Sequence, residues 1–395
     1  MFKIAKWYKN YNAPAVLMID DLSDAYIDVY RESYKNDWGY LCNKEGSSYN
    51  YLRKNLLDKY PNIKITFFTP YLRHNVINEY CKYNYKKYAV GEREEFTSFL
   101  KGLVVDGHEI AHHGSNHGKY LDIRRCTTVN NWIHEWALFE DIETGIKVTL
   151  DGVKIFKETC GIDLVGGKYC GYITRENSQK IIDKCNFLYW CDKPSYNTNN
   201  FDESFFGKNN IVSFPTNYAG NSFVRLTYVS GDTRRDRKKF FFKYFQPLYD
   251  IYCYMNLYKL YKKQQIISIQ EHYSPSTTAG TVQSANIVTD IKSLNKIFSF
   301  LSNLSIWYAN CKNISEYIYI RDNSKLRILD NKLEIYFNNQ KNITNPIVSI
   351  VSQQSFRLKQ GDNLLVSIEN NGMHVVNVSL DNYLTTCLIY NDLNI

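Results

Sequence analysis

Long hydrophobic runs are missing from this sequence of 395 residues. The N-terminal stretch from Met1 to Tyr8 contains no apolar run of the length that a signal peptide needs. No later segment is apolar enough over about 20 residues to cross a bilayer. The sequence therefore predicts a cytoplasmic protein without a membrane-spanning helix.

Closely spaced cysteine pairs are missing as well. The ten cysteines are scattered along the chain, and no two of them are separated by two residues. Cysteine-ligated zinc fingers and CxxC redox centres are therefore not expected. Scattered cysteines are typical of reduced thiols in a cytosolic protein.

Positive charge is in excess, with a formal net charge of +8, and part of it is concentrated in residues 234–245. Six basic side chains alternate there with aromatic ones. One interpretation is a strip that binds anionic lipid headgroups or an acidic glycan, which would hold the protein at the inner face of a membrane. The other is an ordinary helix with basic residues outside and aromatic residues inside. Nucleic acid is not an expected partner, because no recognition motif accompanies the charge.

Short apolar segments alternate with helical patterns over the first 320 residues or so. Such alternation indicates a parallel α/β arrangement, and 44% hydrophobic residues suffice for a large core. The expected strands are Ala15–Ile19, Ile63–Phe68, Val104–Ile110, Ile162–Gly166, Phe187–Cys191, Ile211–Phe214 and Ile266–Ile269. The expected helices are Tyr49–Tyr60, Arg93–Leu103, Trp132–Lys157, Arg175–Cys185, Arg237–Lys263 and Ile287–Leu304.

Seven strands favour a (β/α) barrel over an open sheet. Active sites of such barrels lie at the carboxyl ends of the strands. Asp20 and Asp21 follow the first strand, a histidine-rich run follows the third, and His272 follows the seventh. These residues are therefore expected to converge at one rim.

The sequence changes character at about Asn323, where short alternating strands are joined by turns rich in Asn, Asp and Gly. We expect an α/β barrel at residues 1–322 and a small antiparallel β domain at residues 323–395. The β domain is interpreted as structural cover, with glycan binding as the alternative.

Four of the eight histidines lie within ten residues. His108 and His112 are four residues apart, and so are His113 and His117, a spacing that can bring two imidazoles to one metal ion. A carboxylate from the Asp20–Asp21 pair would complete a two-histidine, one-carboxylate site, and the other carboxylate would activate water. The spacing alone does not choose between the two histidine pairs.

In their order along the chain, these motifs resemble the polysaccharide deacetylases of the NodB-homology group, carbohydrate esterase family 4 and its relatives. The resemblance covers roughly residues 13–320. It implies a distorted (β/α) barrel in which Asp20 is the catalytic base and Asp21 a metal ligand. The segment from Thr66 to Phe68 matches the second-strand signature of the family. The run from Gly107 to His117 matches the next motif and implies His113 and His117 as ligands.

The later motifs match less closely. At residues 166–171, Lys168 stands where the family has arginine and Cys170 where it has proline. The resemblance implies that Lys168 lies near Asp20 or Asp192, and that the backbone N–H of Gly171 holds an oxyanion. It also implies Trp190 as a wall of the substrate pocket.

His272, in the last motif, is implied as the general acid. The resemblance thus implies a divalent ion, with Zn²⁺ expected, and the hydrolysis of an acetamide on an N-acetylated sugar. The expected carbohydrate substrate is a surface polysaccharide or its intracellular precursor. The alternatives are O-deacetylation, deformylation of a nucleotide- or lipid-linked sugar, or glycan binding without catalysis.

Overall fold

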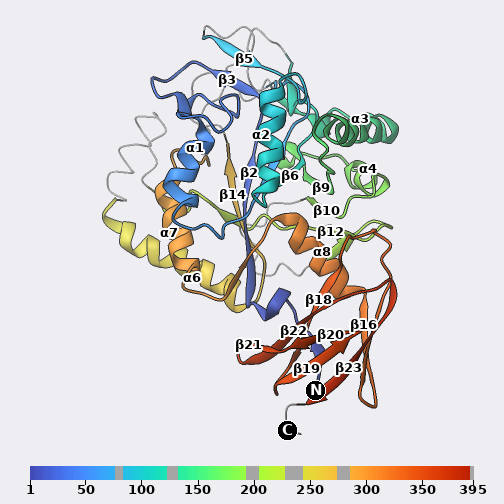
Figure 1. The fold of residues 1–395 in the computed structure, drawn as a ribbon. Coiled ribbons are helices and arrows are strands. Elements are labelled where there is room, and N and C mark those ends of the chain that lie inside the picture. Colours follow the sequence, from blue (N-terminus) through green and yellow to red (C-terminus); the bar gives the residue numbers. More distant parts are fainter. Residues whose placement is uncertain (76–82, 122–131, 193–203, 227–242, 274–284, 392–395) are drawn as a thin grey trace.

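The computed structural model describes residues 1–75, 83–121, 132–192, 204–226, 243–273 and 285–391. It has a large α/β part and a smaller layer of β-strands, and the N-terminus lies at the β layer (Figure 1). No helix in these described ranges is both long and apolar enough to cross a bilayer.

A ten-stranded sheet forms the centre of the α/β part. Every neighbouring pair is parallel except β11 and β12. Along the sheet the strands are β11 (Ser204–Phe206), β12 (Ile211–Ser213), β10 (Tyr189–Cys191), β9 (Gly166–Lys168), β6 (Glu109–His112), β4 (Ile65–Thr69), β2 (Ala13–Asp20), β14 (Ile267–His272) and β13 (Tyr218–Ala219), while β15 (Ile306–Tyr308) pairs with the start of β2.

The predicted parallel α/β sheet is confirmed, but the predicted count of seven strands is not. All seven expected segments overlap strands of this sheet, and β11, β13 and β15 are additional. These three contain only two or three residues each, which is too short for a hydrophobic period to reveal. The third expected strand began too early, because Val104 and Val105 end the helix before it.

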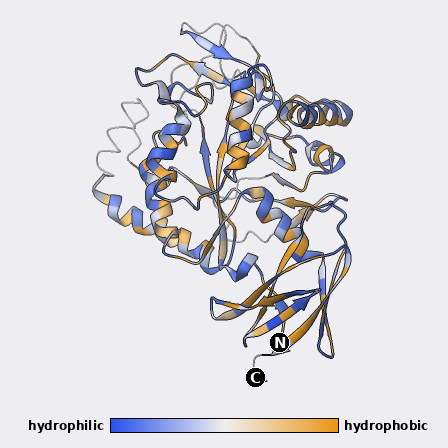
Figure 2. Cartoon of the chain, in the orientation of Figure 1, coloured by the Kyte–Doolittle hydropathy of each residue, from blue (hydrophilic) through white to orange (hydrophobic). Residues whose placement is uncertain are grey.

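Helices surround this sheet (Figure 1). Figure 2 shows α2 with hydrophobic residues along one side, and its buried residues include Phe96, Leu100 and Leu103. Part of the expected helix at 237–263, and most of the basic segment at 234–245, lie outside the described residues. The helices are α1 (Ser48–Leu52), α2 (Glu94–Val105), α3 (Ile142–Ile155), α4 (Ser178–Lys184), α6 (Gln246–Lys262), α7 (Ile291–Leu301) and α8 (Cys311–Asp322).

Strand β2 is buried along its whole length, and its residues alternate between two cores. Leu17 and Ile19 pack in the core that includes residues of α2 and α7. Val16 and Met18 pack in a second core with Phe68 and Ala111, inside the curl of the sheet. Because side chains alternate along a strand, Asp20 belongs to the inner set, at the carboxyl end of the strand.

Residues from Ser324 onward form two antiparallel sheets. Strand β1 (Lys3–Ile4) pairs with β18, so the N-terminal residues join this layer although the sequence assigned them to the barrel. One sheet contains β1, β18 (Ile347–Ser352), β22 (Met373–Ser379) and β21 (Ile368–Asn370); the other contains β16 (Ser324–Leu329), β17 (Lys332–Phe337), β23 (Tyr383–Asn391), β19 (Phe356–Gln360) and β20 (Asn363–Val366).

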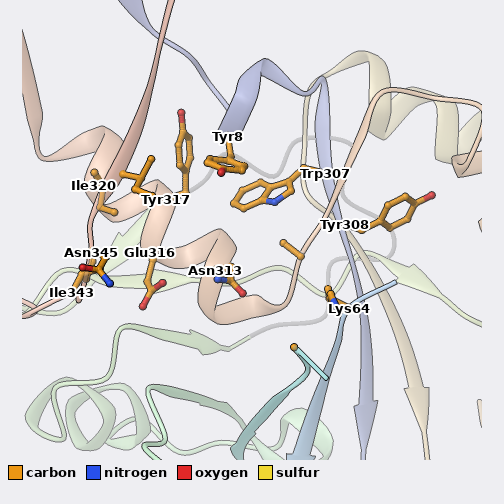
Figure 3. Close-up of a pocket in the computed structure, with 13 residues that line it drawn as sticks. Tyr8, Lys64, Trp307, Tyr308, Asn313, Glu316, Tyr317, Ile320, Ile343 and Asn345 are labelled. Atoms are coloured by element: carbon orange, nitrogen blue, oxygen red, sulfur yellow. The ribbon is translucent and has the colours of Figure 1, made fainter. Parts of the chain in front are cut away.

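A cavity of about 430 Å³ lies where the two parts meet (Figure 3). The rings of Tyr8, Trp307 and Tyr317 gather there, with centroids 5.3–6.2 Å apart. Lys64 and Gly107 also line it. Lys64 immediately precedes β4, and Gly107 lies shortly before β6. The cavity therefore lies at the amino ends of the strands, away from Asp20.

Glu109 is a carboxyl group buried inside the curl. It accepts hydrogen bonds from the hydroxyls of Thr66 and Tyr189 and from the backbone N–H of Lys312. Burial nevertheless raises the pKa of Glu109 from 4.5 to about 7, because these bonds offset only part of the lost hydration.

This shift predicts a pH-dependent stability. The folded pKa lies above the unfolded value, so the contribution of Glu109 is complete below about pH 4.5 and is lost as pH rises through about 7. Relative to Glu109→Gln, the wild type should lose about 2.5 kcal/mol of unfolding free energy between about pH 5 and about pH 8. Urea unfolding at both pH values measures the difference. The same substitution at the exposed Glu140 is the control.

Candidate metal centre and active site

Two adjacent acids end strand β2 inside the curled sheet. Asp20 is 5% exposed and Asp21 is 1% exposed. Asp21 adopts a left-handed backbone conformation with φ of 67°, which is uncommon and strained for a residue with a side chain. Such strain is often found at functional sites, and here it lies at the residue between the strand and the following loop.

Three imidazoles surround the Asp21 carboxylate. Its Oδ1 lies 3.3 Å from His74 Nε2, 3.5 Å from His113 Nε2 and 3.3 Å from His117 Nε2. All three histidines are buried. His117 has a φ of 70°, so two members of this cluster are held in strained backbone conformations.

Burial and neighbouring charges set the ionisation of the cluster. Burial alone would raise the pKa of Asp21, but His117, His113 and His74 hold it well below its usual range. Burial lowers the pKa of His117 well below 6.5, although the Asp21 charge opposes this. A carboxylate beside neutral imidazole is the form in which these side chains bind a metal.

The tautomer of His113 tests whether a cation fits here. Its Nδ1 lies 3.2 Å from the carbonyl oxygen of Lys168, which can only accept, so Nδ1 carries the proton. In neutral His113 the lone pair of Nε2 then faces the lone pairs of Asp21 Oδ1; burial favours this neutral form, but Asp20 and Asp21 outweigh burial and raise the pKa of His113 above 6.5. The buried Nε2 of His113 and Nδ1 of His117 have no hydrogen-bond partner. A cation between the imidazoles and the carboxylate would relieve this repulsion, so the donor set fits a metal ion.

Glu135 fixes the loop that carries the ligands. Its buried carboxylate accepts from three consecutive backbone N–H groups, those of Ser115, Asn116 and His117, at 2.8–3.2 Å. Gly114 has a φ of 77°, and a Cβ there would lie 2.7 Å from Glu135. The loop is therefore shaped by a carboxylate on its inner side.

Lys168 pairs with Asp20, one of the two partners that the sequence predicted. Its Nζ lies 2.9 Å from Asp20 Oδ1 and also donates to Gln270. The side chain of Lys168 is fully buried, and its ammonium lies 5.1 Å from the ring centres of Phe68 and Tyr172. A buried ammonium thus neutralises the carboxylate beside the imidazole cluster.

His272 and Gly171 lie on elements next to these acids. His272 pairs in register with Asp20 across β14 and β2. Its Nδ1 lies 2.7 Å from the carbonyl oxygen of Ala285 and donates to it, so Nε2 is the ring nitrogen that can exchange a proton with a bound molecule. Gly171 has a φ of 58°, and a Cβ there would lie 2.4 Å from His134. Only glycine fits this turn without displacing His134.

Trp190 and Asp192 differ from their predicted surroundings. Trp190 is fully buried in a core with Trp136, Tyr169 and Phe187, so it supports the sheet and is no exposed pocket wall. Asp192 accepts from Ser213 at 2.7 Å and from Gln179, while Lys168 pairs with Asp20 instead. The aromatic neighbours of Trp190 lie far apart in the sequence, so its burial could not be predicted.

The other two histidines of the run are structural. His108 accepts from the N–H of Ile65, and burial lowers its pKa to about 4. His112 accepts from the N–H of Gly114, and burial lowers its pKa to about 3. Both are neutral near pH 7. The structure thus groups His113 and His117 with Asp21, as the family resemblance implied.

Sequence patterns missed His74, Glu135 and Gln270. His74 lies 53 residues from Asp21 in a stretch without a recognised motif. Glu135 and Gln270 are single polar residues whose partners are distant in the sequence. A cue existed only for Gln270, which lies two residues before His272 on the same strand.

No family model matches the sequence, and no curated protein matches it either. Solved structures do resemble the fold. One is a Mycobacterium smegmatis protein assigned as a polysaccharide deacetylase, with 14% identity, a TM-score of 0.44, and coverage of 80% of this chain and 93% of that one. Another is the PuuE allantoinase, with 15% identity, a TM-score of 0.43, and coverage of 79% and 92%.

A third is a family 4 acetyl xylan esterase from Clostridium thermocellum, solved with a cobalt ion. Its identity is 10%, its TM-score is 0.37, and the match covers 76% of this chain and 90% of that one. The polysaccharide deacetylases to which the motifs are similar are thus also among the structural neighbours of this chain.

The buried ion pair predicts a strong energetic coupling. Lys168→Met leaves the Asp20 charge buried without its ammonium and should lower the unfolding free energy by about 3 kcal/mol. In an Asp20→Asn background, the same substitution should cost at least about 1 kcal/mol less, because no charge remains to neutralise. Chemical denaturation of the four proteins in the cycle measures the coupling.

The exposed pair of Lys157 and Asp163, 2.6 Å apart, provides the control cycle. Its coupling should stay within about 1 kcal/mol, because solvent screens it. Strict additivity at Lys168 and Asp20 would contradict the pairing.

Proposed function

We propose that this protein is a metal-dependent deacetylase that hydrolyses the acetamide of an N-acetylated sugar, with Zn²⁺ as the resident ion. The observation that carries the proposal is the pair of adjacent acids with different partners. Asp21 faces imidazole nitrogens, whereas Asp20 faces an ammonium. One acid is thus suited to binding a cation and the other to handling a proton.

Asp21, His113 and His117 would hold the ion, as the family resemblance implies. When bound, it would polarise the carbonyl of the substrate and acidify water. Asp20 would take the proton of the attacking water through Oδ2, which lies 3.9 Å from His113 Nε2, while Oδ1 accepts from Lys168. The N–H of Gly171 would stabilise the oxyanion. His272 would return a proton to the departing amine through Nε2, giving acetate and a free amino sugar.

Alternatives on the same site are an O-deacetylase and a deformylase of a nucleotide- or lipid-linked sugar. Both would use the same acids. A glycan-binding protein without catalysis has no need for a buried, ion-paired Asp20 beside the imidazole cluster, and this favours an enzyme. We also propose that the β layer after residue 322 is an accessory unit that covers the amino ends of the strands.

Acetate release tests the function. The protein, loaded with Zn²⁺, should release acetate from members of a panel of nucleotide- and lipid-linked N-acetyl sugars. Asp20→Asn should keep one ion per chain and lose at least about 100-fold in turnover, because it removes the base and spares the ligands. His113→Ala should lose the ion, and His108→Ala should retain the ion and the turnover. Normal turnover by Asp20→Asn would show that Asp20 is not the base. Release of formate in place of acetate, from N-formyl sugars, would identify the protein as the deformylase.

We further propose that α6 binds an anionic lipid surface, which would keep the enzyme at the inner face of a membrane. Side chains on one side of this helix and just before it are exposed and apolar, including Leu248 at 66% and Met255 at 65%. Asp250 lies on another side and binds Lys296. Basic residues flank the exposed apolar face at Lys259, Lys262 and Lys263, and the sequence adds six more at residues 234–243. The exposed apolar face consists of Tyr244, Phe245, Leu248, Ile251, Tyr252, Met255 and Tyr258.

Vesicle flotation tests this surface. The wild type should float with vesicles of phosphatidylserine and phosphatidylcholine and not with phosphatidylcholine alone. Leu248→Ser with Met255→Ser should weaken the binding by about 10-fold or more, because two apolar side chains are lost. Val105→Ser, at a site 85% exposed on α2, is the control. Unchanged flotation contradicts the proposal, and a change in oligomeric state alone would assign the face to a second copy.

A further inference from the structure

His74 is a third imidazole beside Asp21, and it comes from outside the loop that carries His113 and His117. Its Nε2 lies 3.3 Å from Asp21 Oδ1 and its ring is 1% exposed. His74, Asp21 and His117 present ligand atoms that all lie within 4.8 Å of one another. The resemblance to known deacetylases implies only Asp21, His113 and His117 as ligands, so His74 is additional.

Backbone hydrogen bonds hold His74 against the ligand loop. The N–H groups of Tyr71, Leu72 and Asn75 donate to the carbonyls of Gly114, Ser115 and Asn116, respectively, at 2.7–3.3 Å. The segment around His74 therefore runs beside the loop between the two motif histidines. The rings of His74 and His117 are stacked 5.0 Å apart, and Trp38 packs edge-on against His74. The position of His74 is thus built by the fold.

The distances around Asp21 Oδ1 agree with a shared ion. Charge-assisted hydrogen bonds between nitrogen and carboxylate are typically about 2.7–2.9 Å long. The three distances here are 3.3, 3.3 and 3.5 Å. Ligands bound tetrahedrally at about 2.0–2.1 Å lie about 3.3 Å from one another. Each imidazole nitrogen therefore lies at a ligand–ligand distance from Asp21 Oδ1 and is too far for a strong hydrogen bond. The ligand atoms of Asp21, His74 and His117 form one such group, and His113 belongs to a second group with His117.

From this geometry we infer that His74 is a fourth protein ligand, so that the site contains three imidazoles and one carboxylate. The inference rests on the proposed function only for the presence of the ion. A set of three nitrogens and one oxygen favours Zn²⁺ or Co²⁺ over Mg²⁺ and Ca²⁺. Substrate or water would then enter as a fifth ligand, which zinc sites accept. Cys170 is not in the set, because its thiol donates to the carbonyl of His113.

Cobalt binding to the full-length protein tests this inference without reference to activity. After removal of metal, the wild type should bind one Co²⁺ per chain and show the intense visible bands of a low-coordinate site. His74→Ala should weaken the affinity by more than about 100-fold, beyond the loss typical of an outer hydrogen-bond partner, and should change the bands. His74→Gln separates the two roles, because its amide can still donate to Asp21. If His74 only orients Asp21, His74→Gln should restore the Co²⁺ affinity and the spectrum. If His74 binds the ion, His74→Gln should restore neither.

Matched variants make every outcome decisive. His134→Ala, whose ring lies 5.5 Å from that of His117, should bind Co²⁺ like the wild type. Wild-type affinity and spectrum in His74→Ala, with loss of the ion in His113→Ala, would overturn the role of His74 and leave the proposed function standing. Unchanged binding in both His74→Ala and His113→Ala would overturn the metal site itself. Circular dichroism of the metal-free variants confirms that they fold.

Discussion

The buried charge of Asp21 is the constraint on which the site depends. A carboxylate that is 1% exposed is costly unless cations or strong donors surround it. Three imidazoles from two segments converge on one of its oxygens; the carbonyl of Lys168 orients His113, and the rings of His74 and His117 stack on each other. The strained φ of Asp21 and of His117 is maintained because the surrounding hydrogen bonds leave these residues no relaxed alternative.

The sheet separates this chemistry from the apolar core. Inner and outer positions alternate along β2, so Leu17 and Ile19 stabilise the contact with the helices while Asp20 lies on the inner side. Polar side chains on the inner side lie at two levels along the strands. Glu109 lies deep inside with three hydrogen-bond donors, and the pair of Asp20 and Lys168 lies toward the carboxyl ends. The carboxyl groups of Asp20 and Glu109 are each matched by partners from other strands or loops, which links the candidate site to folding.

Replacement of the family arginine by Lys168 illustrates how the fold compensates. An ammonium is compact and cannot make the two parallel bonds of a guanidinium. In this chain the ammonium also donates to Gln270 and lies 5.1 Å from the ring centres of Phe68 and Tyr172. The pairing with Asp20 is kept, whereas the link to Asp192 is absent and Ser213 takes that place. The turn therefore keeps a positive charge next to the candidate base with a different set of neighbours.

The sequence by itself determined the parallel α/β class, the acids at the end of β2 and the histidines of one loop, because hydrophobic period and short motifs are local properties. Only the tertiary structure decided that His74 joins Asp21, that Glu135 shapes the ligand loop and that Trp190 is core. These contacts join residues that are distant in the sequence. The short strands β13 and β15 also form only because neighbouring strands offer them partners. Packing and long-range hydrogen bonds leave no period in the sequence, so the fold alone reveals them.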